Sequence, residues 1–253
     1  MIRIEELKRV AERKRMSVLN AEKDYLLDVL LFSISQEIRG DIVLKGGTSL
    51  YKLYNLNRFS EDLDFTLNSK KLDYRHCAEQ LSRSIRLIGI TSSYTVEAHN
   101  KEANIFFSFR GPLYDGRKES TCHISLNISH RERLSMHYVK SFFVSSYSDI
   151  PAFDVIAMDE KEILAEKIRA IVTREKPRDV YDLWFLLKKG IEVDHSLIRK
   201  KLQIYGIEFN SDQFKERMLA KERLWKNDLK GLIIGSLPNF SEVTSEIERL
   251  IER

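Results

Sequence analysis

The sequence predicts an α+β fold, in which a mixed β-sheet with flanking helices is followed by a helical C-terminal domain. Up to about residue 158, short apolar or alternating runs are interspersed with helical segments, as expected for a sheet covered by helices. Beyond that point, apolar residues recur only at helical spacing. We therefore expect one domain over residues 1–158 and a second domain over residues 159–253.

Composition and charge indicate a globular protein without a membrane-spanning segment. Of the 253 residues, 43% are hydrophobic and 32% are charged, which leaves enough apolar side chains for a sizeable core. No apolar run approaches the ~20 residues of a membrane span, and the charged N-terminal segment lacks the apolar stretch of a secretory signal. We therefore expect a cytoplasmic protein with no membrane partner. The net charge of +4 is compatible with a nucleic-acid or nucleotide partner but does not require one.

The spacing of apolar residues separates helices from strands in the N-terminal domain. It predicts helices over residues 3–15, 21–38, 48–55 and 71–89. Alternating or continuous apolar runs predict strands over residues 42–44, 62–67, 104–110, 121–129, 139–146 and 153–158. Gly111, Pro112 and Gly116 lie between the third and fourth of these strands and predict a hairpin there.

The C-terminal domain is predicted to begin with two helices, over about residues 160–174 and 179–189. Asp159, with Glu162 three residues later, forms a start that resembles a capping box. A proline at position 177 separates the two helices. The remaining segment, 195–252, is expected to form two or three amphipathic helices.

A pair of glycines, Gly46 and Gly47, lies between a predicted strand and a predicted helix. Glycines allow the backbone to approach a ligand closely, and the start of a helix presents free N–H groups and a positive dipole end. Thr48 and Ser49 add hydroxyl groups at the same end. These four residues could therefore cradle a triphosphate, although a glycine pair before a helix is more often only a turn.

Two aspartates, Asp62 and Asp64, lie one residue apart on a predicted strand, so their side chains share one face. Leu63 and Phe65 then point into the core. Carboxylates this close repel each other unless a cation lies between them, and hard oxygen ligands suit Mg²⁺ or Mn²⁺. The simpler alternative is a solvated strand end, but the neighbouring glycine turn favours a metal site that would bridge a triphosphate.

The segment Lys45–Phe65, KGGTSLYKLYNLNRFSEDLDF, resembles the first motif of the AbiEii/AbiGii nucleotidyltransferase toxin family. That motif has a Gly-Gly-Thr/Ser turn, a short helix and then Arg-Phe-Ser-Glu-Asp-Leu-Asp. The resemblance extends from about residue 20 to about residue 190. It implies a nucleotidyltransferase-type sheet similar to the core of DNA polymerase β, and a metal-dependent transfer of a nucleoside monophosphate from an NTP to an acceptor hydroxyl.

The same resemblance implies partners. Some family members transfer nucleotides to the acceptor ends of tRNA, so the implied acceptor is RNA, with tRNA as the first candidate. The family implies a toxin of a toxin–antitoxin or phage-abortive system, with a cognate antitoxin protein encoded nearby. Two alternatives stay open: a nucleotidyltransferase that acts on a small molecule or a protein hydroxyl, and a catalytically inactive nucleotide-binding module.

A second match lies in the C-terminal domain, where Lys167 falls inside the apolar arc of its predicted helix, between Ile163 and Ile171. Such a lysine either extends to solvent or meets an anion. The family pattern has a lysine here, which implies contact with a nucleotide phosphate. The C-terminal domain is accordingly expected to complete the active site.

Asp179 and Asp182 lie in the first turn of the next predicted helix. The residues alone indicate capping and dipole pairing, with Arg178 as a partner of Asp182. The family pattern Arg-Asp-x-x-Asp makes Asp179 the better active-site candidate. We expect it to orient Lys167 or Arg178 rather than to bind metal.

One position departs from the polymerase-β-like pattern, which has a third carboxylate on a later strand. The matching strand here, His123–Ser129, carries Asn127 instead. An asparagine can ligate a metal through its carbonyl oxygen but is not a base. Either one metal suffices, or the base lies elsewhere, or activity is weak. His130 is one candidate base, although a lone histidine more often has a structural role.

Overall fold

The computed structural model describes residues 1–251, which form two compact units. Unit 1 comprises Met1–Leu53, Ser60–Leu134 and Tyr138–Ala157, and unit 2 comprises Tyr54–Phe59, Ser135–His137 and Met158–Arg253. The chain therefore enters unit 2 three times. Within residues 1–251, no helix has both the length and the apolar character that crossing a membrane requires.

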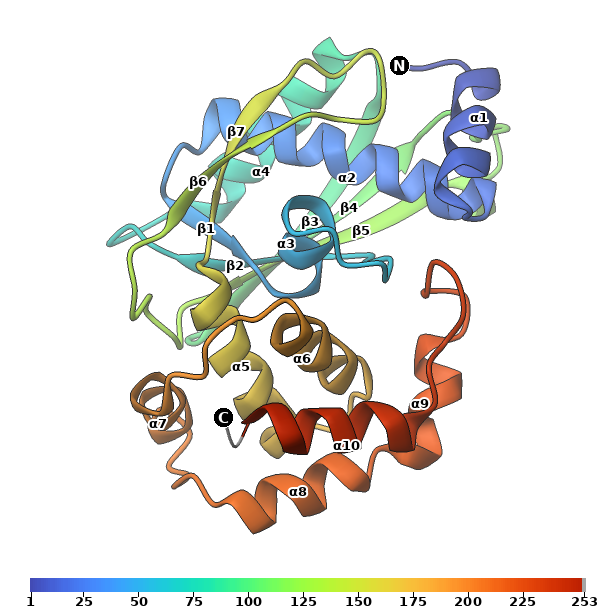
Figure 1. Ribbon diagram of the computed structural model, residues 1–253. Coiled ribbons are helices and arrows are strands. Elements are labelled where there is room, and N and C mark those ends of the chain that lie inside the picture. Colours follow the sequence, from blue (N-terminus) through green and yellow to red (C-terminus); the bar gives the residue numbers. More distant parts are fainter. Residues whose placement is uncertain (252–253) are drawn as a thin grey trace. The chain divides into compact units, whose positions relative to one another are not determined.

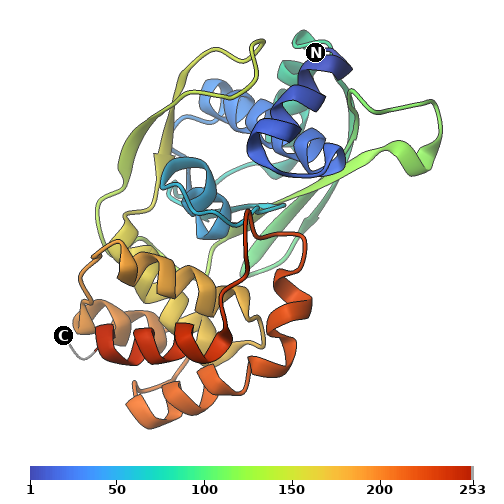
Figure 2. The ribbon, with the colours of Figure 1, turned by 45° about the vertical axis from the view of Figure 1, so that its right-hand side comes forward.

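Unit 1 is built on a sheet of seven strands in the order β3-β4-β5-β2-β1-β7-β6 (Figure 1). The β2–β5 and β1–β7 pairs are parallel and the other neighbours are antiparallel, which confirms the predicted mixed sheet. The strands are β1 Ile42–Lys45, β2 Leu63–Leu67, β3 Thr91–Ala98, β4 Glu102–Arg110, β5 Cys122–Ser129, β6 Val139–Phe143 and β7 Phe153–Ala157. Figure 2 shows the predicted β4–β5 hairpin, whose loop extends away from the sheet.

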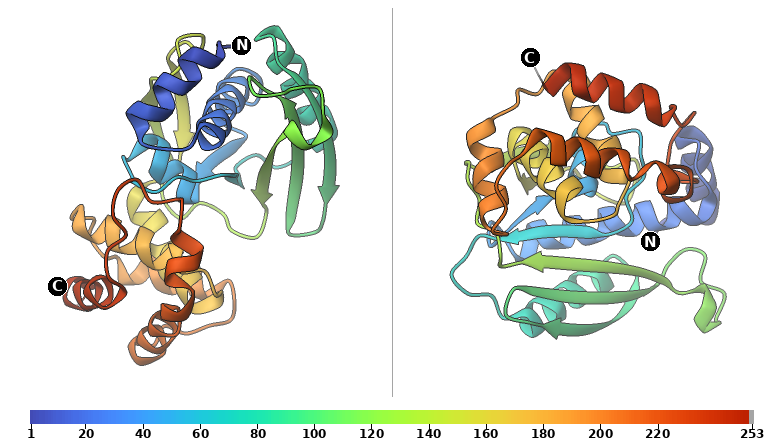
Figure 3. Two further views of the ribbon diagram at one scale, coloured as in Figure 1. Left: turned by 90° about the vertical axis from the view of Figure 1, so that its right-hand side faces the viewer. Right: turned by 90° about the horizontal axis from the view of Figure 1, so that it is seen from below.

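Four α-helices, α1 Ile4–Lys14, α2 Val18–Glu37, α3 Gly46–Leu53 and α4 Tyr74–Leu87, and a short 3-10 helix, Lys118–Ser120 in the β4–β5 loop, complete the described part of unit 1. α2 and α4 pack against each other; α4 also packs on β3 and β4, and α2 on β5 and β7 (Figure 3). On β4 and β5, every second residue is fully buried, whereas the residues between them are half-buried or exposed. One face of this part of the sheet is therefore covered by helices, and the other is open.

Two elements differ from the prediction. Strand β3 was not predicted: its alternation is confined to Tyr94, Val96 and Ala98, and most of its residues are exposed. Helix α3 begins at Gly46 rather than at residue 48, so the two glycines form its first turn instead of a preceding loop.

Unit 2 contains the helices α5 Glu160–Thr173, α6 Arg178–Lys188, α7 His195–Gln203, α8 Ser211–Leu219, α9 Glu222–Leu229 and α10 Phe240–Ile251. α5 packs on α6, on α7 and on α8, whereas α6 also packs on α9 and α10 (Figure 1). Four helices follow residue 195, more than the two or three predicted. Each of α8 and α9 buries only two side chains, which leaves a weak periodic signal.

The start of α5 confirms one part of the predicted cap and corrects the other. The Asp159 side chain accepts the backbone N–H of Lys161, as expected for an N-cap residue. Glu162 does not close a capping box. Its carboxylate instead accepts the backbone N–H groups of Ser135 and Met136, at 2.8 and 2.9 Å, and thereby binds a separate segment of unit 2.

Candidate active site

Asp62 immediately precedes β2 and Asp64 is its second residue, and their side chains lie on the same face of the sheet. Leu63 and Phe65 are buried in the core between and beyond them, as the two-residue period of a strand predicts. Both aspartates reach towards β5, the parallel neighbour of β2. The backbone N–H of Ser125 donates to Asp62 Oδ1 at 3.3 Å, and Asn127 Nδ2 donates to Asp64 Oδ1 at 3.0 Å.

Gly46 lies directly beside Asp64. Strand β1 pairs antiparallel with β2, and Lys45 is the register partner of Asp64. A Cβ atom at Gly46 would lie 3.2 Å from Asp64 Oδ2, and the backbone at Gly46 has φ +70°. Both the close approach and the left-handed backbone favour glycine here. The glycine turn and the two carboxylates, which could have lain far apart, are therefore neighbours.

The amino-terminal end of α3 consequently lies next to the carboxylate pair. An α-helix leaves the N–H groups of its first four residues without intrahelical acceptors, and in α3 these are Gly46 to Ser49. The same end carries the positive pole of the helix dipole. This end of the helix is therefore chemically suited to hold an anion such as a phosphate.

The Thr48 and Ser49 side chains are fully buried. The Thr48 hydroxyl donates to the backbone carbonyl of Asp62 and lies 2.8 Å from the Ser60 hydroxyl. Thr48 therefore ties the first turn of α3 to the segment that carries the first carboxylate. Because Thr48 and Ser49 are buried as whole residues, backbone included, Gly46, which is half-buried, is the accessible residue of this turn.

Acidic and basic side chains both surround the carboxylate pair. Desolvation by neighbouring atoms raises the pKa of Asp62 although its side chain is exposed, and the charge of Asp64 acts in the same direction; the Ser125 N–H and the charge of Lys23 oppose them. Lys23 Nζ lies 3.2 Å from Glu61, and Lys45 Nζ lies 3.4 Å from Glu132. The two nearby lysines are therefore shared with other carboxylates.

These donors fit a hard divalent cation. Within residues 1–251, no cluster of three or more His, Cys, Asp and Glu side chains is arranged for a metal. Asp62 and Asp64 therefore supply only their carboxylate oxygens as ligands. Mg²⁺ in such sites usually completes its coordination shell with water and substrate phosphate oxygens. The sequence did not identify Ser125, whose N–H fixes Asp62, because only the sheet register reveals it.

Asn127 lies beside the carboxylate pair, whereas His130 does not. Asn127 is the register partner of Asp64 and its amide donates to that carboxylate, so it occupies a position beside the pair. His130 does not join them. Its ring stacks on Tyr74 of α4, with centroids 5.3 Å apart, and its Nε2 is hydrogen-bonded to the Tyr74 hydroxyl.

Unit 2 holds the second group of candidate residues in a buried ionic cluster. Lys167 is 5% exposed, and Asp179 and Asp182 are fully buried. The Lys167 Nζ atom lies 3.0 Å from Asp179 Oδ1 and 2.7 Å from Asp182 Oδ2. Of the two possibilities that the sequence left open, this lysine therefore meets anions instead of extending into solvent.

Asp179 is held by two cations. Besides Lys167, it accepts hydrogen bonds from Arg174 Nε at 2.6 Å and Nη2 at 2.8 Å. Burial alone would raise the pKa of Asp179, but Lys167 and Arg174 outweigh burial and hold it well below the usual value. Arg178, the other suggested partner, instead donates its backbone N–H to Asp228.

Asp182 binds a residue from the first motif. Arg58 Nε and Nη2 donate to its two carboxylate oxygens, both at 2.9 Å, and the Arg58 side chain is 1% exposed. The predicted pairing of Asp182 with Arg178 is therefore wrong. Local spacing along one helix suggested Arg178, whereas the actual partner lies 124 residues away in sequence. The signal for Arg58 was its place in the family motif, Arg-Phe-Ser-Glu-Asp-Leu-Asp.

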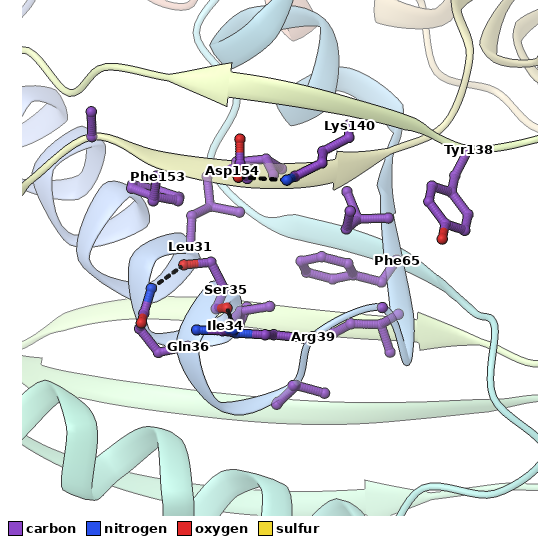
Figure 4. Close-up of a pocket in the computed structure, with 16 residues that line it drawn as sticks. Leu31, Ile34, Ser35, Gln36, Arg39, Phe65, Tyr138, Lys140, Phe153 and Asp154 are labelled. Carbon is purple, nitrogen blue, oxygen red and sulfur yellow. Dashed lines mark hydrogen bonds and ion pairs between the residues drawn. The ribbon is translucent and has the colours of Figure 1, made fainter.

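A cavity of about 490 Å³ lies elsewhere in unit 1 (Figure 4). Its walls include Ile34 at the end of α2, Phe65 of β2 and Phe153 of β7, and Arg39 and Lys140 also line it. Phe65 points to the opposite face of β2 from the carboxylates. The cavity is therefore separate from the aspartate pair.

Comparison with known proteins identifies the family. Residues 29–247 match the family model described as nucleotidyl transferase AbiEii toxin, type IV TA system. A curated relative, an uncharacterized protein of Aquifex aeolicus (strain VF5), is 29% identical over 220 residues, which cover 87% of this chain and 83% of the relative.

Solved structures share the fold. MenT4, the nucleotidyltransferase toxin Rv2826c of Mycobacterium tuberculosis H37Rv, aligns with a TM-score of 0.71 at 20% identity, covering 99% of this chain and 89% of that chain. JHP933 from Helicobacter pylori aligns with a TM-score of 0.64 at 20% identity, covering 94% and 92%. With the family match over most of its length, the chain belongs to the AbiEii family and is a nucleotidyltransferase toxin of a type IV toxin–antitoxin system.

Proposed function

We propose that this toxin transfers a nucleoside monophosphate from an NTP to a hydroxyl group of RNA, with tRNA as the first candidate, and that Asp62 and Asp64 hold the Mg²⁺ or Mn²⁺ the reaction requires. One observation carries the proposal: the two carboxylates share a face of the sheet, and the amino-terminal end of α3 lies beside them. A metal anchor and an anion site thus come from neighbouring elements of one unit.

The reaction exchanges one bond for another at the α-phosphorus of the NTP. The acceptor oxygen bonds to the α-phosphorus, the bond from that phosphorus to the β-phosphate oxygen breaks, and pyrophosphate leaves. A bound divalent metal supplies positive charge that neutralises the phosphate oxygens. The amino-terminal end of α3, formed by Gly46, Gly47, Thr48 and Ser49, would hold the triphosphate with the half-buried Gly46 as its accessible residue, while the Thr48 hydroxyl fixes the Asp62 segment.

The proton of the acceptor hydroxyl passes to solvent water in this scheme. Asn127 occupies the place next to Asp64 where a third carboxylate would act as a base, and its amide donates to Asp64 instead of accepting a proton. Asn127 then serves to position Asp64. A weak or absent general base lowers the rate of the transfer, since such catalysis typically contributes about 10²–10⁴-fold.

Lys167 and Asp179 belong to the proposed machinery as well, Lys167 as a cation for the nucleotide phosphates and Asp179 as the carboxylate that positions it. Their support is the family pattern and the ion pair between them. The same cluster includes Arg58 and Arg174, so three cationic side chains contact the two buried carboxylates.

The test is transfer from each of the four NTPs, labelled at the α-phosphate, to total RNA, comparing wild type with Asp64→Asn. We expect labelled RNA with the wild type and a loss of about 100-fold or more in the variant, because a metal ligand is removed. Asp115→Asn, which changes an exposed carboxylate in the β4–β5 loop, is the matched control and keeps wild-type activity.

Other outcomes separate the alternatives. Label that enters small molecules or protein, with none in RNA, contradicts the RNA acceptor but keeps the chemistry. NTP binding without any product in any fraction identifies an inactive nucleotide-binding module. Equal activity of wild type and Asp64→Asn would remove the metal site from the proposal.

A further inference from the structure

The open face of the sheet continues beyond the carboxylate pair onto β5 and β4. We define this open face by three residues of each strand: Asn104, Phe106 and Ser108 on β4, and His123, Ser125 and Asn127 on β5. All six are half-buried or exposed. Hydrogen bonds join the face to the site, because Asn127 donates to Asp64 and the Ser125 N–H donates to Asp62.

Phe106 is unusual on this face. Its neighbours are polar, yet its ring is 37% exposed, whereas Phe107 and Phe109 of the same strand are fully buried against the helix-covered face. An exposed aromatic ring among polar side chains adds nothing to the core. Solvent-accessible rings of this kind are the usual stacking platforms for bases of single-stranded nucleic acids.

The register fixes how far Phe106 lies from the aspartates. Phe106 is the direct partner of Ser125 on β5, and Ser125 in turn donates to Asp62. The three residues therefore form one row across three strands. Since neighbouring strands are about 4.8 Å apart, the row spans about 10 Å, which is comparable to the length of one nucleotide.

The strand order places the amino-terminal end of α3 and Phe106 on opposite sides of the carboxylate pair. β2, which carries the aspartates, lies between β1 and β5. Gly46 and the amino-terminal end of α3 follow β1, so the anion site is on one side, whereas Phe106 is on the other side, beyond β5. In phosphoryl transfer the attacking and leaving oxygens lie roughly in line on opposite sides of the phosphorus. The side away from the anion site is therefore the side from which the acceptor approaches.

We propose that Phe106 is the stacking platform for the base of the acceptor nucleotide, with Asn104 and Ser108 beside it on the same face. The inference rests on the proposed transfer to RNA and adds the subsite that holds the receiving end. A stacked base leaves the ribose hydroxyl pointing towards the aspartates. Stacking also tolerates any base, so this subsite selects single-stranded ends rather than a sequence.

The experiment compares three variants in the RNA transfer assay, with the apparent KM measured separately for RNA and for NTP. Phe106→Ala removes the ring, and Phe106→Trp keeps an aromatic surface. Tyr94→Ala is the matched control, because Tyr94 is 36% exposed but lies on the opposite face, where its register partner is Phe107. Thermal unfolding of each variant checks that it folds.

We expect Phe106→Ala to lower kcat/KM for RNA by between about 5-fold and about 150-fold while leaving the KM for NTP unchanged. Phe106→Trp should retain most of the activity, and Tyr94→Ala should behave as wild type. A Phe106→Ala protein as active as the Tyr94→Ala protein overturns the inference. So does a change confined to the KM for NTP, which would place the NTP base there. Wild-type protein that labels no RNA contradicts the proposed function itself and the platform with it.

Discussion

Among single residues, Asp62 is a site carboxylate whose pKa departs from the usual value. Its pKa lies above the usual aspartate value because of desolvation and the charge of Asp64. A raised pKa in the folded state favours the neutral carboxyl, so the stability it contributes is present at low pH and is lost as the pH rises through that pKa. A metal acts in the opposite direction, because only the ionised form binds it.

We expect the difference in melting temperature between wild type and Asp62→Asn to depend on both pH and metal. In metal-free protein, Asp62→Asn stays neutral and accepts the Ser125 N–H as before, so its melting temperature should gain on that of wild type as the pH rises from about 4 to about 7. Added Mn²⁺ should raise the melting temperature of the wild type only, and the increase should be larger at higher pH. Differential scanning fluorimetry measures both effects. A pH-independent difference between the two proteins contradicts the assigned environment of Asp62.

Contacts between residues that are close along the chain were easier to predict from the sequence than contacts between distant residues. Asp62, Asp64 and Gly46 belong to the consecutive elements β1, α3 and β2, so strand period and the glycine turn sufficed to bring them together. Arg58 and Asp182 are separated by more than 120 positions. Their pairing depends on tertiary packing, and local helix spacing suggested the wrong arginine.

At the scale of elements, the connection between α3 and β2 positions the site. The Thr48 hydroxyl donates to the Asp62 carbonyl. We expect Thr48→Val, which keeps the shape but not the hydroxyl, to destabilise the protein by about 1–2 kcal/mol, because the buried Thr48 hydroxyl loses its hydrogen bonds to the Asp62 carbonyl and to Ser60. Metal affinity should fall with it, since Asp62 is less well held. Chemical denaturation and Mn²⁺ titration give the two quantities.

Ser49→Ala is the control for this prediction. Ser49 is the next residue of α3 and is equally buried, but its Oγ is without a hydrogen-bond partner among the described residues. Removing that hydroxyl should leave stability and metal affinity within about 0.5 kcal/mol of wild type. If Ser49→Ala lost as much stability and metal affinity as Thr48→Val, any change in this turn would disturb the site. The hydrogen bond from Thr48 to the Asp62 carbonyl would then have no special role.

Element prediction failed where the apolar signal was weak. The β4 and β5 strands alternate between a buried and an open face, and both were predicted with their hairpin. β3 lies at the edge of the sheet and is mostly exposed, so its apolar alternation is short and weak although Thr, Tyr and Val favour strands. Its pairing with β4 makes it a strand.

At the scale of the whole molecule, the chain passes between the two units several times. A boundary near residue 158 describes the last passage, but Tyr54–Phe59 and Ser135–His137 also belong to unit 2. Arg58 anchors the first of these segments through Asp182, and the backbone of Ser135 and Met136 anchors the second through Glu162. Short segments of this kind do not differ in composition from the residues around them, so the sequence predicted only a single domain boundary.

The ionic cluster of unit 2 allows its structural and chemical roles to be separated. Lys167→Met replaces the ammonium group by an apolar side chain of similar length, while Asp182 keeps Arg58 and Asp179 keeps Arg174. We expect a stability loss of no more than about 2 kcal/mol, because no buried carboxylate is left unpaired. Asp182→Ala leaves the buried Arg58 without its carboxylate and should cost about 3–5 kcal/mol.

The transfer activities of Lys167→Met and Lys167→Arg then test the role of Lys167. If Lys167 offsets the phosphate charge, Lys167→Met should lose transfer activity by at least about 10-fold at a temperature where it is fully folded, since a charge-assisted hydrogen bond contributes about 1.5–3 kcal/mol. Lys167→Arg should restore part of the loss because it restores the charge. A stable Lys167→Met protein with wild-type activity would instead make Lys167 a structural counter-ion.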